Sequence, residues 1–230
     1  MWKRSIKGVR YTKDHPKKSS ETVIIEKHLT VILNDTPLWN TISTPRLEKE
    51  LAIGYLIANN HIQGITDIED IKTTPTSVSI TTKPGVTKTK TTPSKDDLSL
   101  TAFEVIALMA EFQEKSVMYK DTGIAHSASL CNSTEVLLFA DDLNRFNALF
   151  KLIGQSQRQD IPFENHITVM SGKLSSDIIE ILITQKCPYL ISRMGITDKA
   201  YDMSQDNNMT VIGFSRGKTF TAYSGLHRVR

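Results

Sequence analysis

Cysteine is scarce in this sequence, and its scarcity excludes several kinds of site. The 230 residues contain two cysteines, Cys131 and Cys187, which lie far apart and form no CxxC pair. A disulfide framework or a four-cysteine zinc site within one chain is therefore excluded. An isolated cysteine of this kind is more often a small apolar residue of the core than a nucleophile, so we expect both thiols to be buried.

Long apolar runs are also missing. No stretch approaches the roughly 18 apolar residues that a membrane-spanning helix needs, and the basic N-terminus is not followed by the apolar segment of a secretory signal. We therefore expect a cytoplasmic protein that does not enter a membrane. The composition, with 39% hydrophobic and 23% charged residues, suits one large domain or one domain with a smaller appendage.

Positive charge is concentrated at the N-terminus. Residues 1–18 contain seven lysines or arginines and one acid, whereas the rest of the chain contains 21 basic and 24 acidic residues. The basic character therefore belongs to an arm, residues 1–20, and the remainder is net acidic. We expect the arm to be solvated and partly mobile. A nucleic-acid-binding module that uses this arm is the alternative that the charge pattern leaves open.

The N-terminal part of the chain predicts a mixture of strands and one helix. Residues 22–33 are rich in β-branched side chains, which favour strands, and Asn34 with Asp35 predicts a turn. Thr44 and Pro45 are typical of a helix start, with threonine as the N-cap and proline at the first helical position.

The domain organisation follows from a change in composition. The Thr-rich residues 66–93 predict short strands and loops, and residues 83–95 are the segment that we expect to be mobile and to hold a domain boundary. The predicted units are the basic arm 1–20, a smaller α+β subdomain over 21–95 and a larger α/β domain over 96–230.

The larger domain alternates strand and helix patterns. A helix is predicted from the capping box at Thr101 to about residue 118. This alternation predicts a layered α/β domain with a parallel or mixed sheet, in which ligands lie beyond the carboxyl ends of the strands. The further predicted strands are 126–131, 136–140, 167–170, 189–192, 210–214 and 218–223, and the helices are 144–153, 175–186 and 198–205.

Polar and glycine-containing clusters fall at the predicted junctions of these elements. Glycine permits close backbone approach, helix N-termini attract anions, and Arg and Lys bind phosphate. Together they predict a site for a phosphate-bearing ligand, although neither a Rossmann nor a Walker motif is present. The candidate binding residues are Thr122, Gly123, His126, Asp142, Arg145, Asn147, Ser171, Gly172, Lys173, Ser192, Arg193, Thr197, Arg216 and Gly217.

Two of these candidates have more than one interpretation. His126 could serve as a general base or as a hydrogen-bonded residue of the core. Asp142 could bind a metal or a ribose hydroxyl, or it could cap the helix that follows. We assign no catalytic residue and no metal ligand from the sequence.

The same segments resemble the formate dehydrogenase accessory protein (FdhD) family. The resemblance rests on the Thr122-Gly123 segment with His126, on Ser171-Gly172, on Ser192-Arg193 and on the Gly-Phe-x-Arg-Gly run that ends at Gly217. It implies a role in formate dehydrogenase maturation, binding of the bis-guanine-dinucleotide molybdenum cofactor, and sulfur transfer from a cysteine desulfurase. It also implies a main domain similar to the cytidine-deaminase fold. Formate dehydrogenase and a desulfurase are the implied partners, and a homodimer is a further expectation.

This sequence departs from the family pattern at several positions. Family members carry a CxxC before the long helix, whereas residues 88–95 here contain no cysteine, and Phe146 and Phe150 replace a histidine and an aspartate. Because persulfide transfer needs a reactive thiol, we expect a divergent member that keeps ligand binding and lacks sulfur transfer.

Two other function classes are weaker. A zinc nucleotide deaminase needs a catalytic glutamate beside its histidine and a P-C-x-x-C motif. Ala128 stands two residues after His126, where that glutamate would be, and Cys187-Pro188 has no second cysteine, so we expect no zinc. A nucleic-acid-binding module is disfavoured by the acidic balance of the globular part.

Overall fold

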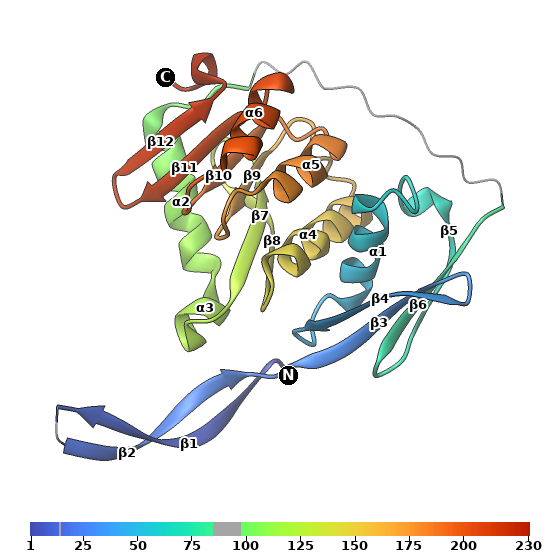
Figure 1. Ribbon diagram of the computed structural model, residues 1–230, viewed down its shortest axis with the longest axis vertical. Coiled ribbons are helices and arrows are strands. Elements are labelled where there is room, and N and C mark those ends of the chain that lie inside the picture. The colour runs from blue at the N-terminus through green and yellow to red at the C-terminus, as the bar shows by residue number, and fades with distance from the viewer. Residues whose placement is uncertain (14, 85–97) are drawn as a thin grey trace.

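The largest sheet among the described residues has six strands. The computed structural model describes residues 1–13, 15–84 and 98–230 (Figure 1). The strand order is β12-β11-β10-β9-β7-β8. The strands are β7 (His126–Cys131), β8 (Val136–Asp142), β9 (Ile167–Met170), β10 (Tyr189–Ser192), β11 (Thr210–Arg216) and β12 (Thr219–Ser224).

Pairing within this sheet is mixed. Strands β9, β10 and β11 are parallel, while β7 is antiparallel to both of its neighbours and β12 is antiparallel to β11. His126 pairs with Asp142, and Ala128 pairs with Met170. The first residue of β7 therefore lies at the same edge as the carboxyl ends of β8 to β11, which is the edge where the sequence predicts ligand binding.

Helices cover both faces of the sheet (Figure 1). Tyr189 and Ile191 pack into a core with α2, while Leu190 between them joins the core on the opposite face. This alternation is the two-residue period of a strand that is buried on both sides. The covering helices are α2 (Ala102–Lys115) on one face and α4 (Arg145–Gln159), α5 (Ser176–Thr184) and α6 (Asp198–Asp206) on the other.

The mixed α/β prediction is confirmed, and most of the predicted boundaries are close to the observed ones. The Thr101 capping box is present, with Glu104 as its partner. Strands β9 and β10 begin and end at the predicted residues. The closer likeness to a cytidine deaminase stays a prediction. Among the described helices, none is long and apolar enough to span a membrane.

A second sheet forms the smaller N-terminal unit. Asn34 and Asp35 have φ values of 47° and 63°, so the predicted turn is confirmed as one that reverses the chain between adjacent strands. Helix α1 packs between this sheet and α4 (Figure 1). The elements are β3 (Lys27–Leu33), β4 (Thr36–Ser43), β5 (Ile68–Thr73), β6 (Ser77–Thr82), α1 (Glu48–Ala58) and a 3-10 turn, Ile65–Asp67.

The predicted start of the first helix is wrong. Helix α1 begins at Glu48, after Leu47 adopts a left-handed conformation with φ 56°. Thr44 is not an N-cap, because its backbone N–H and hydroxyl donate to the Asp142 carboxylate instead. A tertiary contact has taken the hydroxyl that would have capped a helix. Most of the predicted boundary segment 83–95 lies outside the described residues.

The N-terminal arm forms regular structure that the sequence did not predict, while its mobility stays a prediction. Strands β1 (Lys3–Thr12) and β2 (His15–Ile24) form an antiparallel hairpin that projects from the body (Figure 1). Its base contacts the short helix α3 (Val117–Thr122), where Lys3 Nζ lies 2.6 Å from Asp121 Oδ2. Charged residues on both faces of the hairpin conceal the apolar alternation that normally identifies a strand.

Candidate functional site

A cleft of about 500 Å³ opens at the carboxyl edge of the six-stranded sheet. Four of the predicted residues line it and come from β7 and from the ends of β9, β10 and β11. They are His126, Ser171, Arg193 and Arg216. The other wall is formed by the end of α2 and by α3, including Phe112, Ser116 and Tyr119, which the sequence did not single out. The sequence predicted one helix as far as about residue 118, and the structure corrects this with a break between α2 and α3 at Ser116.

His126 lines this cleft and is partly buried. Its Nδ1 is 3.4 Å from Ser171 Oγ, and that oxygen accepts the Ser127 backbone N–H at 2.9 Å. Burial lowers the pKa of His126, the Arg145 charge lowers it further, and Asp142 opposes both. A neutral imidazole near pH 7 can accept one hydrogen bond and donate another, so His126 suits ligand recognition or proton transfer.

Two arginines supply the positive charge of the cleft. Arg216 is held in place, because its Nε donates to the Arg193 carbonyl at 2.9 Å and its guanidinium lies 5.7 Å from the Phe214 ring centroid. For the Arg193 guanidinium, no hydrogen bond or ion pair occurs with any described residue. A guanidinium that lines a cleft and has no such partner is suited to bind an anionic ligand.

The loop after β9 is shaped by close packing. A Cβ on Gly172 would lie 3.0 Å from Arg145 Cδ, so only glycine fits without a shift. Ser192 Oγ donates to the Gly172 carbonyl at 2.7 Å and accepts the Met194 N–H at 3.1 Å. Ser192 therefore fixes two neighbouring loops, and its own side chain is buried away from solvent.

Arg145 is a further cationic candidate that contacts this loop. Its guanidinium lies 4.6 Å from the Phe146 ring, and its Nε is buried with no hydrogen-bond partner among the described residues. The charge acts on His126 at short enough range to lower that pKa. Phe146 thus holds Arg145 through a cation–π contact.

The other predicted residues lie at the ends of elements around the cleft. Thr122 Oγ1 donates to the Met118 carbonyl, and Gly123 ends α3 with φ 77°. Thr197 precedes α6, and Gly217 occupies the turn after β11 with φ 58°. Lys173 is exposed in the loop after β9.

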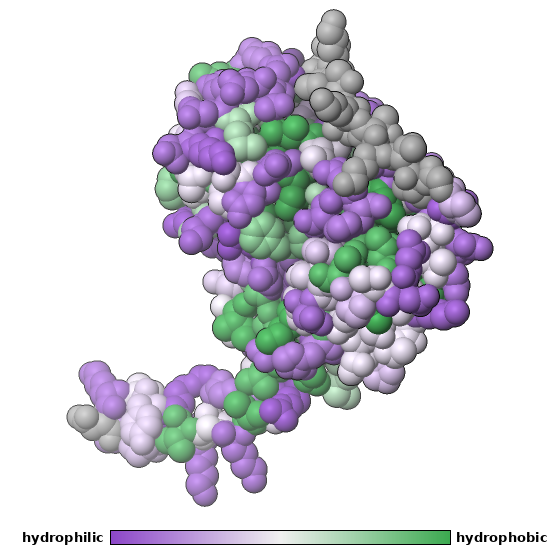
Figure 2. All heavy atoms as spheres, turned by 45° about the vertical axis from the view of Figure 1, so that its right-hand side comes forward, coloured by the Kyte–Doolittle hydropathy of each residue, from purple (hydrophilic) through white to green (hydrophobic). Residues whose placement is uncertain are grey.

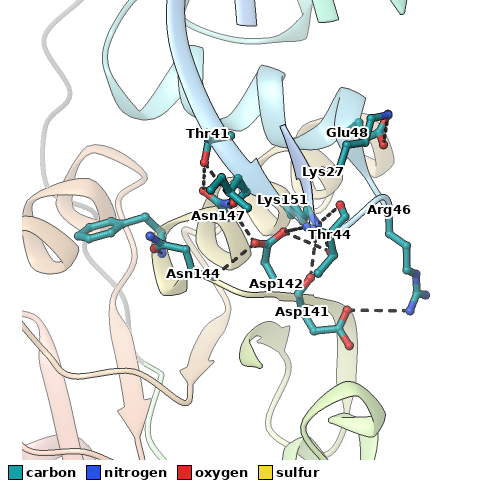
Figure 3. Close-up of polar contacts among 12 residues, drawn as sticks. Lys27, Thr41, Thr44, Arg46, Glu48, Asp141, Asp142, Asn144, Asn147 and Lys151 are labelled. Carbon is teal, nitrogen blue, oxygen red and sulfur yellow. Dashed lines mark hydrogen bonds and ion pairs between the residues drawn. The ribbon is translucent and has the colours of Figure 1, made fainter. Parts of the chain in front are cut away.

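Asp142 and Asn147 belong to a separate buried network (Figure 3). Lys151 Nζ lies 2.5 Å from Asp142 Oδ2, and both side chains are fully buried. Asn147 Nδ2 donates to Asp142 Oδ1 at 3.0 Å and to the Ile42 carbonyl at 2.9 Å. Lys151 Nζ also donates to Thr44 Oγ1 at 2.7 Å. The structure therefore surrounds these two candidates with protein partners and does not bring them to the cleft.

Both cysteines are buried, as the sequence predicted. Burial raises the pKa of the Cys131 thiol to about 12. The Cys187 thiol lies 3.2 Å from Thr168 Oγ1 and contacts the Tyr189 carbonyl. Neither thiol lines the cleft.

The fold and cleft define a layered α/β protein with two arginines lining a cleft at one edge of its sheet. The FdhD/NarQ family model matches residues 24–95 and 78–230, so the chain belongs to that family. "Sulfur carrier protein FdhD" of Listeria monocytogenes serotype 4b (strain F2365) is 27% identical over 238 residues, covering 90% of this chain and 91% of the relative. The Bacillus subtilis (strain 168) protein of the same name is 28% identical over 251 residues, covering 96% and 95%.

A crystal structure from Desulfotalea psychrophila shares the fold. Its protein is described as a candidate formate dehydrogenase accessory protein, with a TM-score of 0.88, 20% identity and full coverage of both chains. At this identity the likeness concerns the fold alone.

Proposed function

We propose that this chain is a formate dehydrogenase maturation factor that binds the guanine-dinucleotide form of the molybdenum cofactor at the cleft. The observation that carries the proposal is the Arg193 guanidinium, which lines the cleft beside Arg216 without a partner among the described residues. A pyrophosphate is the group in that ligand which two neighbouring arginines would bind. Membership of the FdhD/NarQ family supports the client enzyme, and the similar crystal structure is described by the same enzyme.

The dimensions and chemistry of the cleft suit part of such a ligand. Its volume of about 500 Å³ lies within the roughly 300–1,000 Å³ of small-molecule sites. Phe112 and Met194 supply apolar contact, and His126 and Ser171 supply hydrogen bonds. We assign one nucleotide end of the cofactor to this space. The molybdenum centre would supply the redox chemistry of the client, and the residues here would bind and orient it.

Sulfur transfer is the part of the family role that we do not assign to this chain. The thiolate is the form that takes up sulfur, and burial disfavours a thiolate at Cys131. The relatives are named sulfur carriers. Because both thiols of this chain are buried, we place its action after sulfur uptake, on a cofactor that it holds. A cysteine desulfurase and a homodimer stay predicted partners.

Nucleotide binding tests the proposal directly. Guanosine diphosphate should raise the unfolding temperature, because a ligand at about 100 times its Kd stabilises the folded state by about 2.7 kcal/mol. Arg193→Ala should remove most of that shift, and Arg4→Ala, which removes an arginine outside the cleft, should retain it. Adenosine diphosphate measures the preference for guanine. No shift with either nucleotide in the unmodified chain would exclude a nucleotide site.

A further inference from the structure

The N-terminal hairpin is the largest feature that the cleft does not explain. Within the described residues, β1 and β2 pair only with each other. The pairing runs from Lys3 opposite Ile24 to Thr12 opposite His15. Figure 2 shows the hairpin standing away from the body, with hydrophilic side chains and a few hydrophobic ones exposed along it. The hairpin extends the predicted basic arm of residues 1–20 as far as Ile24, and from here on the arm means residues 1–24.

The arm is strongly basic on both of its faces. It contains seven lysines or arginines and two acids, a formal charge of +5. Residues directly opposite each other share a face, so Lys7 and Lys18 lie on one face, with Arg10 and Lys17 on the other. Glu21 neutralises Arg10 through a 3.0 Å ion pair. Most of this charge therefore faces solvent.

Such a ribbon is poorly stabilised by its own contacts. A two-stranded hairpin alone in water is marginally stable, and like charges directly opposite each other destabilise it further. Arg10 stands opposite Lys17 in this way. Three apolar side chains are also exposed, Ile6 by 41%, Val9 by 53% and Tyr11 by 71%. An acidic partner would relieve the repulsion and cover these side chains.

The arm is connected to the cleft through α3. Ile24 packs with Met118 and Ala125 in a small buried cluster at the base of the arm. On the same segment, Tyr119, Lys120 and Ala125 line the cleft. A partner bound along the arm would therefore stand beside the mouth of the cleft, where it could receive a ligand.

We propose that the arm docks onto an acidic face of the client enzyme, formate dehydrogenase, and so brings it to the cleft; this inference rests on the proposed function. A protein is favoured over nucleic acid because two of the three exposed apolar side chains, Ile6 and Val9, are aliphatic and, unlike Tyr11, cannot stack on bases. The free strand edges can accept a strand from a protein.

Charge reversal tests the docking. Binding of the full chain to purified formate dehydrogenase apoprotein is measured by biolayer interferometry at two salt concentrations. Lys7→Glu with Lys18→Glu should weaken the Kd at least tenfold and reduce its salt dependence. The matched control, Lys72→Glu with Lys199→Glu, makes the same change of net charge on exposed residues of the body and should stay within about threefold of the unmodified chain.

Several results would overturn the inference. Equal weakening by the control pair, or no binding by the unmodified chain, would remove the arm as a docking element. A dimer by light scattering that the arm variant dissociates would make a second copy the occupant. Salt-dependent binding of arbitrary duplex DNA that the arm variant alone loses would favour nucleic acid. Circular dichroism checks folding. The guanosine diphosphate shift should survive in both variants, and its absence would count against the proposed function instead.

Discussion

Single thiols decide whether this chain can take up sulfur. Because burial raises the pKa of Cys131 to about 12, almost none of that thiol is ionised near neutral pH, and Cys187 is also buried. Incubation with a cysteine desulfurase and radiolabelled cysteine should therefore leave little persulfide on the folded chain. Stoichiometric label on either cysteine, released by reductant, would show that a buried thiol has become the carrier.

A matched gain of function makes this experiment decisive. Thr91→Cys with Ser94→Cys creates a CxxC in the segment where the resemblance predicts one, and the native cysteines are left unchanged. This variant should accept label if the desulfurase recognises the chain. Label on the variant alone would attribute the loss of transfer to the missing thiols. No label on either would point to loss of the desulfurase contact.

At the scale of elements, α1 and α4 approach each other more closely than any side chain permits. A Cβ added to Gly54 would lie 1.8 Å from the Phe150 carbonyl oxygen, and one on Gly154 would lie 2.0 Å from the Glu50 carbonyl oxygen. Glycine inside a helix usually costs about 0.5–1 kcal/mol relative to alanine. Its presence at both positions indicates that the close crossing is worth more than this cost.

Gly54→Ala should therefore destabilise the protein, although alanine has a higher helix propensity than glycine. We expect about 3 kcal/mol or more, the upper end of the range for overpacked cores, because the clash is with backbone atoms that cannot rotate away. Urea unfolding measures it. Gly8→Ala is the control, since a Cβ there would meet nothing closer than 3.4 Å. A change below about 1 kcal/mol in Gly54→Ala would show that the helices can move apart.

Elements were predictable from the sequence where burial imposes a simple pattern. Strands β9 and β10 are short apolar runs with polar boundaries, and their limits were predicted correctly. The start of α1 was not, because the side chain of Thr44 is used in a contact with Asp142, 98 residues away in the sequence. The arm was not, because its strands lack a buried face.

The candidate site was predictable only in part, for a related reason. A position at the end of a strand places a residue at the ligand-binding edge, but it does not fix the direction of the side chain. His126 and Arg193 line the cleft, whereas Asp142 turns inward to Lys151. The helical wall contributed by Tyr119 comes from a segment that no strand-end pattern identifies.

Over the whole molecule, the two predicted units share one core. A single cluster of buried residues includes Leu29 of the small sheet, Leu51 of α1, Leu149 of α4 and Leu190 of the large sheet. The buried Lys151 network adds polar contacts across the same junction. We therefore expect both units to unfold together, because exposing either would leave the other with an uncovered apolar face.

Removing the buried lysine tests this coupling. Lys151→Met deletes the ammonium group and leaves the Asp142 carboxylate fully buried without its counter-charge, a change that costs about 3–5 kcal/mol in buried pairs. Trp39 fluorescence reports on the small sheet and far-ultraviolet circular dichroism on the helices, in a Trp2→Phe background that removes the only other tryptophan. Both urea transitions should coincide and move together to lower concentration.

The control and the contrary result concern the same two signals. Lys199→Met removes an exposed lysine and should change stability by no more than about 0.5 kcal/mol. If Trp39 fluorescence changed well before the circular dichroism in Lys151→Met, the small sheet would detach while the large domain stayed folded. The junction would then be a hinge between two independent units. Because the Lys151 network and the Gly54–Gly154 crossing both lie at that junction, we expect coincidence to persist even in the destabilised variant.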